Sequence, residues 1–515
     1  MKKNIFALSV AAALAGFAGS AAAQVAQVPF IPANNNVAVG ETVATAFEVN
    51  AGGVGHILLT PYYTVQGARN TLLNIVNTDT KNGKAVKVRF RGARNSDDVF
   101  DFYVFLSPGD VWRSRVYTKD GQTRLDVPDS SCTLPSRDVV NATAFKTERV
   151  YDGKDVAETR EGYVEFLTAA DIPEGSALYK TIKHHFVTGA VECDLEQLVK
   201  STVRLTTAQA AKDNGLYFPS AGLVGHWAVV DVSKNTAVSG NNTALLAVDA
   251  GVAALGNIVV APQDGDLVPD AWVGGANAGT TDPLLTNKAV LPVNVDFPDL
   301  STPYVHYAAL KAPATNAAGH QANELSAALA VKSIMNEFAT GQGVDLKTDW
   351  VFSLPTRRYG VAIDYQASGP ARFVKNDQSA FFGAENVTLG KGSVPHLEIR
   401  LNASYYDSSE RGLLPVISPV GTGQRIAGEV NVLTFNGNPA DSVLGAQISA
   451  QSLSPVLGLE SITDGWGTIK LDNKRAALTT NHADYQKLGT PVIGYATFTA
   501  GSAALGFTWP HRFSR

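Results

Sequence analysis

Hydrophobic and polar residues alternate strictly in the segment 85–91, which reads Ala-Val-Lys-Val-Arg-Phe-Arg. Successive side chains of a β-strand point to opposite faces, so this alternation predicts a strand with one buried face. The apolar side chains are expected to face a core: Val86, Val88 and Phe90. The basic side chains of the other face are expected to face water: Lys87, Arg89 and Arg91.

A turn signal lies directly before this strand. Asn82 and Gly83 both tolerate a positive φ, which a tight β-hairpin requires. We therefore predict that the preceding apolar segment, Leu72–Thr78, is the hairpin partner of segment 85–91. Two further strand-like segments follow, Val99–Leu106 and Val111–Tyr117, and the four together predict a meander within a β-sandwich.

Strand-like segments recur in the rest of the chain, each rich in β-branched or aromatic residues between Gly, Pro, Asn or Asp. They are Gly162–Leu167, Leu223–Val232, Trp350–Leu354, Gly360–Tyr365, His396–Tyr406, Ile426–Phe435, Gly467–Leu471 and Pro491–Thr499. No repeat of fixed period is present, which argues against a propeller or a solenoid. The sequence therefore predicts a mainly β fold built from immunoglobulin-like or related β-sandwich modules.

One segment follows the helical period instead. Between Asn323 and Phe338, apolar residues recur at steps of three and four, and the stripe includes Val331 and Met335. Asn323 can cap the start of a helix, and Gly341 lies where the helix would end. We predict one amphipathic helix here, with one face packed on a sheet.

These patterns divide the chain into four regions. Residues 1–23 form a leader, 24–150 an N-terminal β module, 151–320 a loop-rich middle region with some strands, and 321–515 the helix followed by a C-terminal β module. Residues 235–290 are rich in Asn, Gly, Ala and Thr, and we expect them to form exposed loops.

The leader has the three parts of a cleavable signal peptide. Lys2 and Lys3 form a basic start, residues 5–18 are apolar or small, and three alanines supply the small residues that a signal peptidase needs. Cleavage is expected between Ala23 and Gln24. The apolar run of about 14 residues is shorter than the roughly 20 that cross a bilayer as a helix. We expect an exported protein at the cell surface or outer membrane, or alternatively in the periplasm or the medium.

Composition and charge narrow the choice of partners. Without the two leader lysines, the chain carries 47 acidic and 40 basic residues, a net charge of −7, and it has no lysine or arginine stripe. Nucleic acid is therefore not expected as a partner. Charged residues make up 17% of the chain, fewer than in an average soluble protein, which fits a secreted or surface-attached protein with many small polar residues outside.

The chain has two cysteines, Cys132 and Cys193. In an oxidising compartment they can pair, and we expect a structural disulfide. Closing a loop of about 60 residues would stabilise the fold by roughly 4 kcal/mol in the chain-entropy treatment. A reactive pair would be expected to lie closer together, as in Cys-x-x-Cys.

Motifs that carry catalysis are missing from the sequence: there is no nucleophile elbow, zinc-protease motif, phosphate loop or dinucleotide fingerprint. We therefore expect no enzyme and no obligatory cofactor. Asp97 and Asp98, with Asp101 nearby, form one acidic loop, and Asp264 and Asp266 form another. Calcium needs several converging oxygen ligands, but neither spacing matches an EF-hand, so solvated turns are the simpler interpretation and calcium is the alternative.

Two pairs of adjacent residues are further candidate sites. His184 and His185 would point to opposite faces of a strand, so they are not expected to share a metal. Arg357 and Arg358 could contact an anion, but the simpler expectation is that one is exposed and the other is paired.

Several segments resemble a set of proteobacterial proteins described as cell-surface or surface-layer (S-layer) proteins. They are His56–Tyr63, Asn74–Thr80, Val86–Arg91, Leu106–Trp112, Arg160–Glu165 and Thr348–Arg358. The resemblance implies an exported structural protein on the outer surface that forms an array, and it supplies no catalytic residues. Residues 235–320 show no such resemblance.

The expected function is therefore self-association into a surface layer or another envelope-associated assembly. The expected partners are other copies of this chain and the outer cell envelope, with contacts that propagate from copy to copy. The alternative is an adhesin or carbohydrate-binding protein that stacks sugar rings on exposed aromatic side chains. The candidates for such stacking are Tyr62, Tyr63, Tyr405, Tyr406 and Trp466. A hydrolase with a site assembled from distant residues also remains open.

Overall fold

The computed structural model describes residues 44–147, 150, 155–202, 212–256, 317–341, 343–363, 365, 368–375, 379–400, 402–418, 425–437, 442–457, 460–473, 475, 485, 488–501 and 504–515. Strands make up 52% of the structure and helices 11%, with several antiparallel sheets, so the prediction of a mainly β fold is confirmed. The predicted signal peptide 1–23, its cleavage site at Ala23 and Gln24, and the acidic loop with Asp264 and Asp266 lie outside the described residues.

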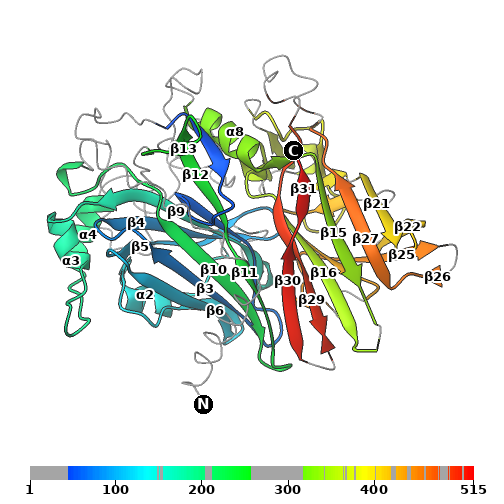
Figure 1. Ribbon diagram of the computed structural model, residues 1–515, viewed down its shortest axis with the longest axis horizontal. Helices are drawn as coiled ribbons and strands as arrows, with labels where there is room; N and C mark the ends of the chain where they lie inside the picture. Colours follow the sequence, from blue (N-terminus) through cyan, green and yellow to red (C-terminus); the bar gives the residue numbers. More distant parts are fainter. Residues whose placement is uncertain are drawn as a thin grey trace.

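The N-terminal half is a sandwich of two sheets (Figure 1). The larger one, here the central sheet, contains in spatial order β1 (Ala46–Val49), β12 (Thr243–Asp249), β2 (Ile57–Thr64), β9 (Glu161–Ile172), β4 (Gly83–Gly92), β5 (Asp98–Leu106) and β8 (Cys132–Leu134), and β13 (Val252–Ala253) pairs with β12. The smaller one contains β11 (Thr236–Asn241), β10 (Leu223–Asp231), β3 (Arg69–Asn77), β6 (Val111–Lys119) and β7 (Gln122–Asp126). Both sheets thus combine strands from before and after residue 150.

Two predictions of local structure are wrong in this half. The hairpin between Leu72–Thr78 and segment 85–91 does not form, because β3 lies in the smaller sheet while β4 pairs with β5 and β9 in the central sheet. A turn signal shows where the chain reverses, but it does not show whether the next strand stays in the same sheet. The described part of the predicted loop region 235–290 contains β11, β12 and β13 instead of exposed loops alone.

The central sheet is covered on both faces. The smaller sheet packs on one face, and the other is covered by α3 (Ala177–Ile182), α4 (Leu195–Thr202), α8 (Ala317–Leu329) and the short 3-10 segment Arg357–Tyr359. The predicted exposure of one face of β4 is therefore wrong. Its basic residues are at most 1% exposed: Lys87, Arg89 and Arg91. The alternation itself is present, but the polar face meets protein instead of water.

The C-terminal half contains one long sheet that folds back on itself. Its strands, in spatial order, are β30 (Leu505–Pro510), β29 (Ile493–Ala500), β16 (Leu346–Ser353), β24 (Val430–Phe435), β25 (Ala450–Leu457), β22 (Gly412–Ser418), β21 (Asn402–Asp407), β27 (Asp464–Lys470), β15 (Ser333–Ala339) and β31 (Arg512–Ser514), and β26 (Glu460–Ser461) pairs with β25. Phe338 of β15 stacks on Phe435 of β24, with ring centroids 4.7 Å apart. The two arms of the sheet thus enclose a second core.

Shorter elements complete the fold. They are α2 (Arg137–Ala142), the 3-10 segments η2 (Val156–Thr159), η6 (Arg357–Tyr359) and η7 (Gly369–Arg372), and the small sheets of β14 (Ala330–Val331) with β28 (Thr490–Pro491), β17 (Val361–Ile363) with β18 (Phe373–Lys375), and β19 (Val387–Leu389) with β20 (Leu397–Arg400) and β23 (Arg425–Ala427).

The predicted helix is present but misplaced. It begins at Ala317 and ends at Leu329, and the residues after it form β14 and β15. Met335 and Phe338 therefore lie on a strand. Val331, Met335 and Phe338 follow one another at steps of four and three, which fits one face of a helix. On β15 the step of three places Met335 and Phe338 on opposite faces of the strand, and of these two only Phe338 is buried.

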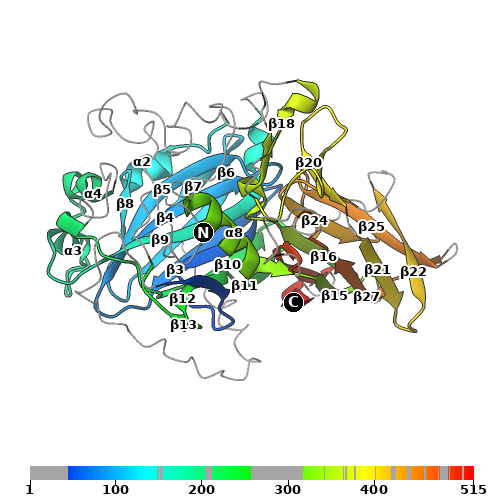
Figure 2. The ribbon, with the colours of Figure 1, turned by 90° about the horizontal axis from the view of Figure 1, so that it is seen from above.

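The two halves lie side by side (Figures 1 and 2). The edge strand β11 of the smaller sheet runs beside the edge strand β30 of the long sheet, and Thr508 donates a hydrogen bond to the carbonyl of Ser239 at 2.5 Å. Trp227 packs on Tyr495 with ring centroids 4.5 Å apart. Apolar residues of both halves share one core, so neither half ends in a free edge at this boundary.

Candidate functional site

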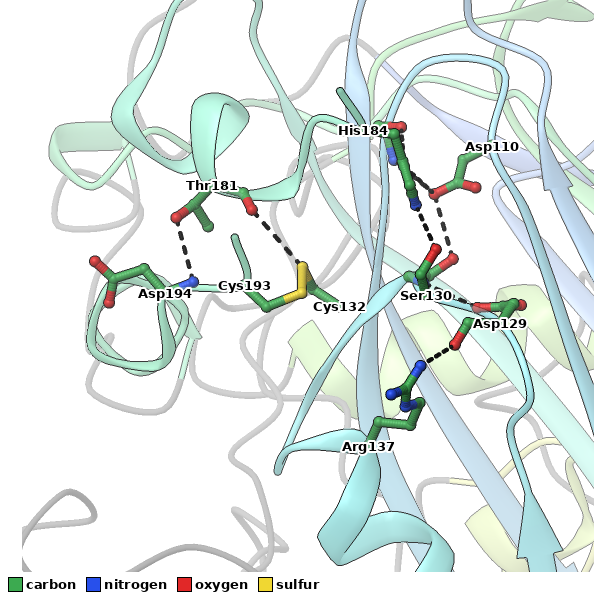
Figure 3. Close-up of a disulfide and its surroundings, with 11 residues drawn as sticks. Asp110, Asp129, Ser130, Cys132, Arg137, Thr181, His184, Cys193 and Asp194 are labelled. Atoms are coloured by element: carbon green, nitrogen blue, oxygen red, sulfur yellow. Dashed lines mark hydrogen bonds and ion pairs between the residues drawn. A yellow bond between two sulfur atoms is a disulfide. The ribbon is translucent and has the colours of Figure 1, made fainter. Parts of the chain in front are cut away.

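The predicted disulfide joins Cys132 and Cys193, whose Cα atoms are 5.3 Å apart (Figure 3). Cys132 begins β8 at the edge of the central sheet, and Cys193 lies just before α4. The disulfide therefore covalently links the segment that contains α3 and α4 to the edge of the central sheet. Disulfides form and persist in oxidising compartments, so this bond indicates an extracytoplasmic location.

A polar cluster beside the disulfide is centred on His184 (Figure 3). Its Nε2 lies 3.1 Å from the hydroxyl of Ser130. Its Nδ1 lies 3.2 Å from the hydroxyl of Ser107 and 3.7 Å from a carboxylate oxygen of Asp110. Sequence reasoning missed this cluster because its members are far apart in the chain. His184 also lies in the segment after α3, where neither His184 nor His185 is on a strand.

Ser130, His184 and Asp110 have the residue types of a nucleophile, a base and an orienting acid. The 3.7 Å contact to Asp110 is longer than a hydrogen bond, so the imidazole is not oriented as catalysis requires. The N–H of Ser131, next to the candidate nucleophile, donates to Asp129 at 2.9 Å and is not directed at a developing oxyanion. We therefore assign the cluster a structural role: it links the segment after α3 to the β5–β6 turn.

Asp97 precedes β5, and Asp98 and Asp101 lie on it; all three are buried, so the interpretation as a solvated turn is wrong. Asp97, Asp98 and Asp101 interact, in that order, with the hydroxyl of Tyr365 (2.7 Å), the guanidinium of Arg91 (3.7 Å) and the ammonium of Lys87 (2.5 Å). Burial lowers the pKa of Lys87, and the adjacent Asp101 opposes that shift. Within the described ranges, no group of three or more His, Cys, Asp or Glu residues could hold a metal. A cation at this loop would have to displace the protein's own basic groups.

Arg357 and Arg358 are both buried and both paired, so the expectation of one exposed arginine is wrong. Arg357 Nε lies 2.7 Å from Glu429, and Arg358 lies 3.0 Å from Glu165 of β9. Burial raises the pKa of Glu429 to about 7, against the opposing pull of Arg357. Arg358 thus joins the C-terminal half to the central sheet, whereas the pair of Arg357 and Glu429 lies within the C-terminal half. Both guanidinium groups face an acid of the same chain.

Glu161 makes a second connection between the halves. Its carboxylate accepts hydrogen bonds from the backbone N–H groups of Gln447, Ile448 and Ser449 at 2.6, 3.0 and 3.1 Å. The hydroxyl of Ser449 donates to it as well, at 2.5 Å. Glu161 is fully buried. Its carboxylate therefore satisfies three consecutive backbone donors of a loop almost 290 residues away in sequence.

Of the aromatic residues proposed to stack on sugars, three are buried. Tyr62 and Tyr63 are 0% exposed and Tyr405 is 1% exposed, so they are core residues and the expectation of exposure is wrong for them. Trp466 is 40% exposed, and its ring stacks on that of Tyr406 with centroids 4.8 Å apart and planes 18° apart. Tyr406 is half-buried, so this aromatic pair is partly exposed to solvent.

The aromatic pair lies in the middle of a polar sheet face. Across β27 and its neighbours, Glu337, Trp466, Tyr406 and Gly412 form one row of directly opposed residues. The next rows on the same face carry Thr468 opposite Ser404 and Lys470 opposite Asn402. We call this surface the outer face of β15, β27 and β21.

A second exposed surface is apolar. Four large side chains are 62%, 39%, 43% and 53% exposed: Leu505, Phe507, Trp509 and Phe513. They lie on β30 and β31, the strands at the two ends of the long sheet (Figure 1). β30 pairs with β29, where the buried Phe498 lies opposite Phe507. β31 pairs with β15, where the buried Ile334 lies opposite Phe513. We call these four residues the C-terminal apolar strip.

Comparisons with known proteins identify no relative. No protein-family model, curated protein or solved structure matches the chain. Among the described helices, none is both long and apolar enough to span a membrane.

Proposed function

We propose that this protein is an exported, cell-surface structural protein that self-associates into a surface layer or another envelope-associated assembly. The export signal in residues 1–23, the disulfide and the mainly β fold support an extracytoplasmic role. The resemblance of several segments to surface-layer proteins points the same way. Other copies of the chain and the outer envelope are the partners.

The C-terminal apolar strip is the observation that carries this proposal. Leu505, Phe507 and Trp509 alternate along β30, and the rings of Phe507 and Trp509 have centroids 5.4 Å apart. Exposed apolar surface of this kind on a monomer is typical of an interaction site. The backbone edge of β30 already lies beside β11, so the strip offers side chains instead of unpaired backbone groups. A copy that buries this strip against a different patch makes a heterologous contact, and such contacts propagate into arrays.

The test is the assembly state of the exported chain beginning at Gln24. Sedimentation velocity across a concentration series, followed by electron microscopy of the concentrated sample, should show large species or sheets. Replacing Phe507 and Trp509 together by serine should leave monomers. Both measurements are made with calcium and with a chelator, because calcium bridging is an alternative route to the same contacts.

A matched control keeps the test specific. Val252 of β13 is 53% exposed on the other half of the molecule, and Val252→Ser should assemble like the unaltered chain. A monodisperse monomer at every concentration, with and without calcium, would overturn the proposal. Equal loss of assembly in the control and in the strip variant would show that the strip is not the contact.

A further inference from the structure

The outer face of β15, β27 and β21 carries a slot beside its aromatic pair. The rings of Tyr406 and Trp466 have centroids 4.8 Å apart, about the spacing of neighbouring strands, and nearly parallel planes. Each ring therefore stands upright above its own strand. One face of Tyr406 covers Trp466, and the strand on the other side of β21 is β22.

The residue opposite Tyr406 on β22 is Gly412. A Cβ atom added at Gly412 would have no atom within 4 Å, so the space next to the free face of Tyr406 is open. The slot thus has an aromatic wall and a floor of bare backbone. The hairpin that closes it, between β21 and β22, carries Arg411, whose side chain is 52% exposed and paired with Asp407.

We propose that this slot binds a pyranose unit of a polysaccharide. A pyranose has an apolar C–H face that packs on an aromatic ring, and hydroxyl groups around its edge that need hydrogen-bonding partners. The outer face supplies both. Three of its polar side chains carry a hydroxyl or amide group: Ser404, Thr468 and Asn402. One acid, Glu337, and one base, Lys470, lie at its margins. Such a mixed rim suits a neutral sugar better than a strongly charged ligand.

A cross-strand aromatic pair can also stabilise a sheet without binding any ligand. Substitutions in the slot can distinguish sheet stabilisation from sugar binding. Stabilisation of the sheet needs the contact between Tyr406 and Trp466. Sugar binding needs, in addition, the free face of Tyr406 and the empty space over Gly412. A side chain placed at position 412 should therefore block binding while the aromatic pair remains intact.

The experiment is isothermal titration of the full exported chain with cellohexaose and, separately, with mannohexaose. The chain carries Phe507→Ser and Trp509→Ser throughout, so that assembly does not interfere. Binding of at least one of the two sugars is expected. Tyr406→Ala should weaken it at least tenfold, and Gly412→Leu should abolish it with the melting temperature unchanged.

Tyr117, a half-buried tyrosine of β6 in the other half, provides the control, and Tyr117→Ala should bind as the parent does. Unaltered affinity in Gly412→Leu, or no binding of either sugar by the parent, would overturn the inference. The inference extends the proposed surface role by naming what the layer would attach to. The two can fail separately, because assembly is read from the strip variants and sugar binding from the slot variants.

Discussion

Buried ionisable side chains of this protein depend on partners supplied by distant parts of the chain. Lys84 of β4 is fully buried, and its ammonium group lies 2.7 Å from Asp171 of β9 and donates to the carbonyl of Ser220 at 3.0 Å. Burial and the nearby Lys84 together lower the pKa of His56 to about 3, which keeps that imidazole neutral. The free-energy cost of burying each of the charged side chains, Lys84 and Asp171, is offset by a specific neighbouring group.

His511 gives a pH-dependent prediction. Its Nε2 donates to the carbonyl of Val351 at 2.9 Å, its Nδ1 accepts from Asn336 at 3.0 Å, and burial lowers its pKa to about 4. In the unfolded chain a histidine titrates near pH 6.5, so below that pH the unfolded state binds a proton that the folded state does not. The free energy of unfolding should fall by about 3 kcal/mol from this residue as the pH drops from about 6.5 to about 4.

The measurement is urea unfolding of the chain beginning at Gln24, at about pH 7 and about pH 4. His511→Gln keeps a donor for Val351 but cannot take up the proton, so it should be less stable at neutral pH and lose less stability on acidification. His56 contributes a loss of the same sign, which remains in the variant. An identical pH dependence in both chains would show that His511 does not titrate as described.

Among the elements, the pairing of β4 with β9 depends on close backbone approach. Gly162 of β9 lies directly opposite Gly92 of β4, and a Cβ atom at Gly162 would overlap the carbonyl oxygen of Arg91. It would also press on the ring of Tyr63. The strand propensity of Ala is no lower than that of Gly, so the penalty for a side chain here comes from the neighbouring strand alone.

Gly162→Ala should therefore destabilise the protein by about 2 kcal/mol or more, because the strands must separate or shift. The matched substitution is Gly412→Ala, on an open strand position where the new methyl group meets nothing within 4 Å. That variant should stay within about 0.5 kcal/mol of the parent. Thermal and urea unfolding of both variants give the comparison, and equal stability of the two would contradict the close-approach argument.

For the whole molecule, the two halves behave as one packed unit because they share buried polar groups and one apolar core. Glu161 is one of these groups, and it accepts from three consecutive backbone amides of the opposite half. Charged hydrogen bonds of this kind are each worth more than neutral ones. Glu161 should therefore position residues 447–449, whereas Ser442 and Leu444 at the start of this loop donate to Asp349.

Glu161→Gln should lower the free energy of unfolding by roughly 3 kcal/mol, because an amide N–H₂ then faces backbone donors in a buried site. Amide hydrogen exchange should show selective loss of protection at residues 447–449, with β6 unaffected. Glu48 is an exposed glutamate of β1, and Glu48→Gln should change neither quantity. Retained protection at 447–449 in Glu161→Gln would argue against a positioning role.

Local sequence was sufficient for many of the strands and for the disulfide, but not for β11, β12 and β15. Segments such as 99–106 and 111–117 coincide closely with β5 and β6, because alternation and turn residues act within a few neighbours. The pairing of Cys132 with Cys193 followed from there being no other cysteine in the chain. The mainly β class likewise needed no knowledge of long-range contacts, and the signal peptide in residues 1–23 stays a prediction.

Only the tertiary structure determined which faces of those strands are buried and which are exposed. The basic face of β4 looked like a surface, and it is buried because helices and the arginines of η6 cover the central sheet from a second side. Tyr405 and Tyr406 are adjacent, yet one is core and the other forms the slot wall. The physical reason is that burial, pairing and ligand access depend on which distant segment packs against a residue. Alternation along one strand shows that the strand has an apolar face and a polar face. It does not show which segments pack against either face.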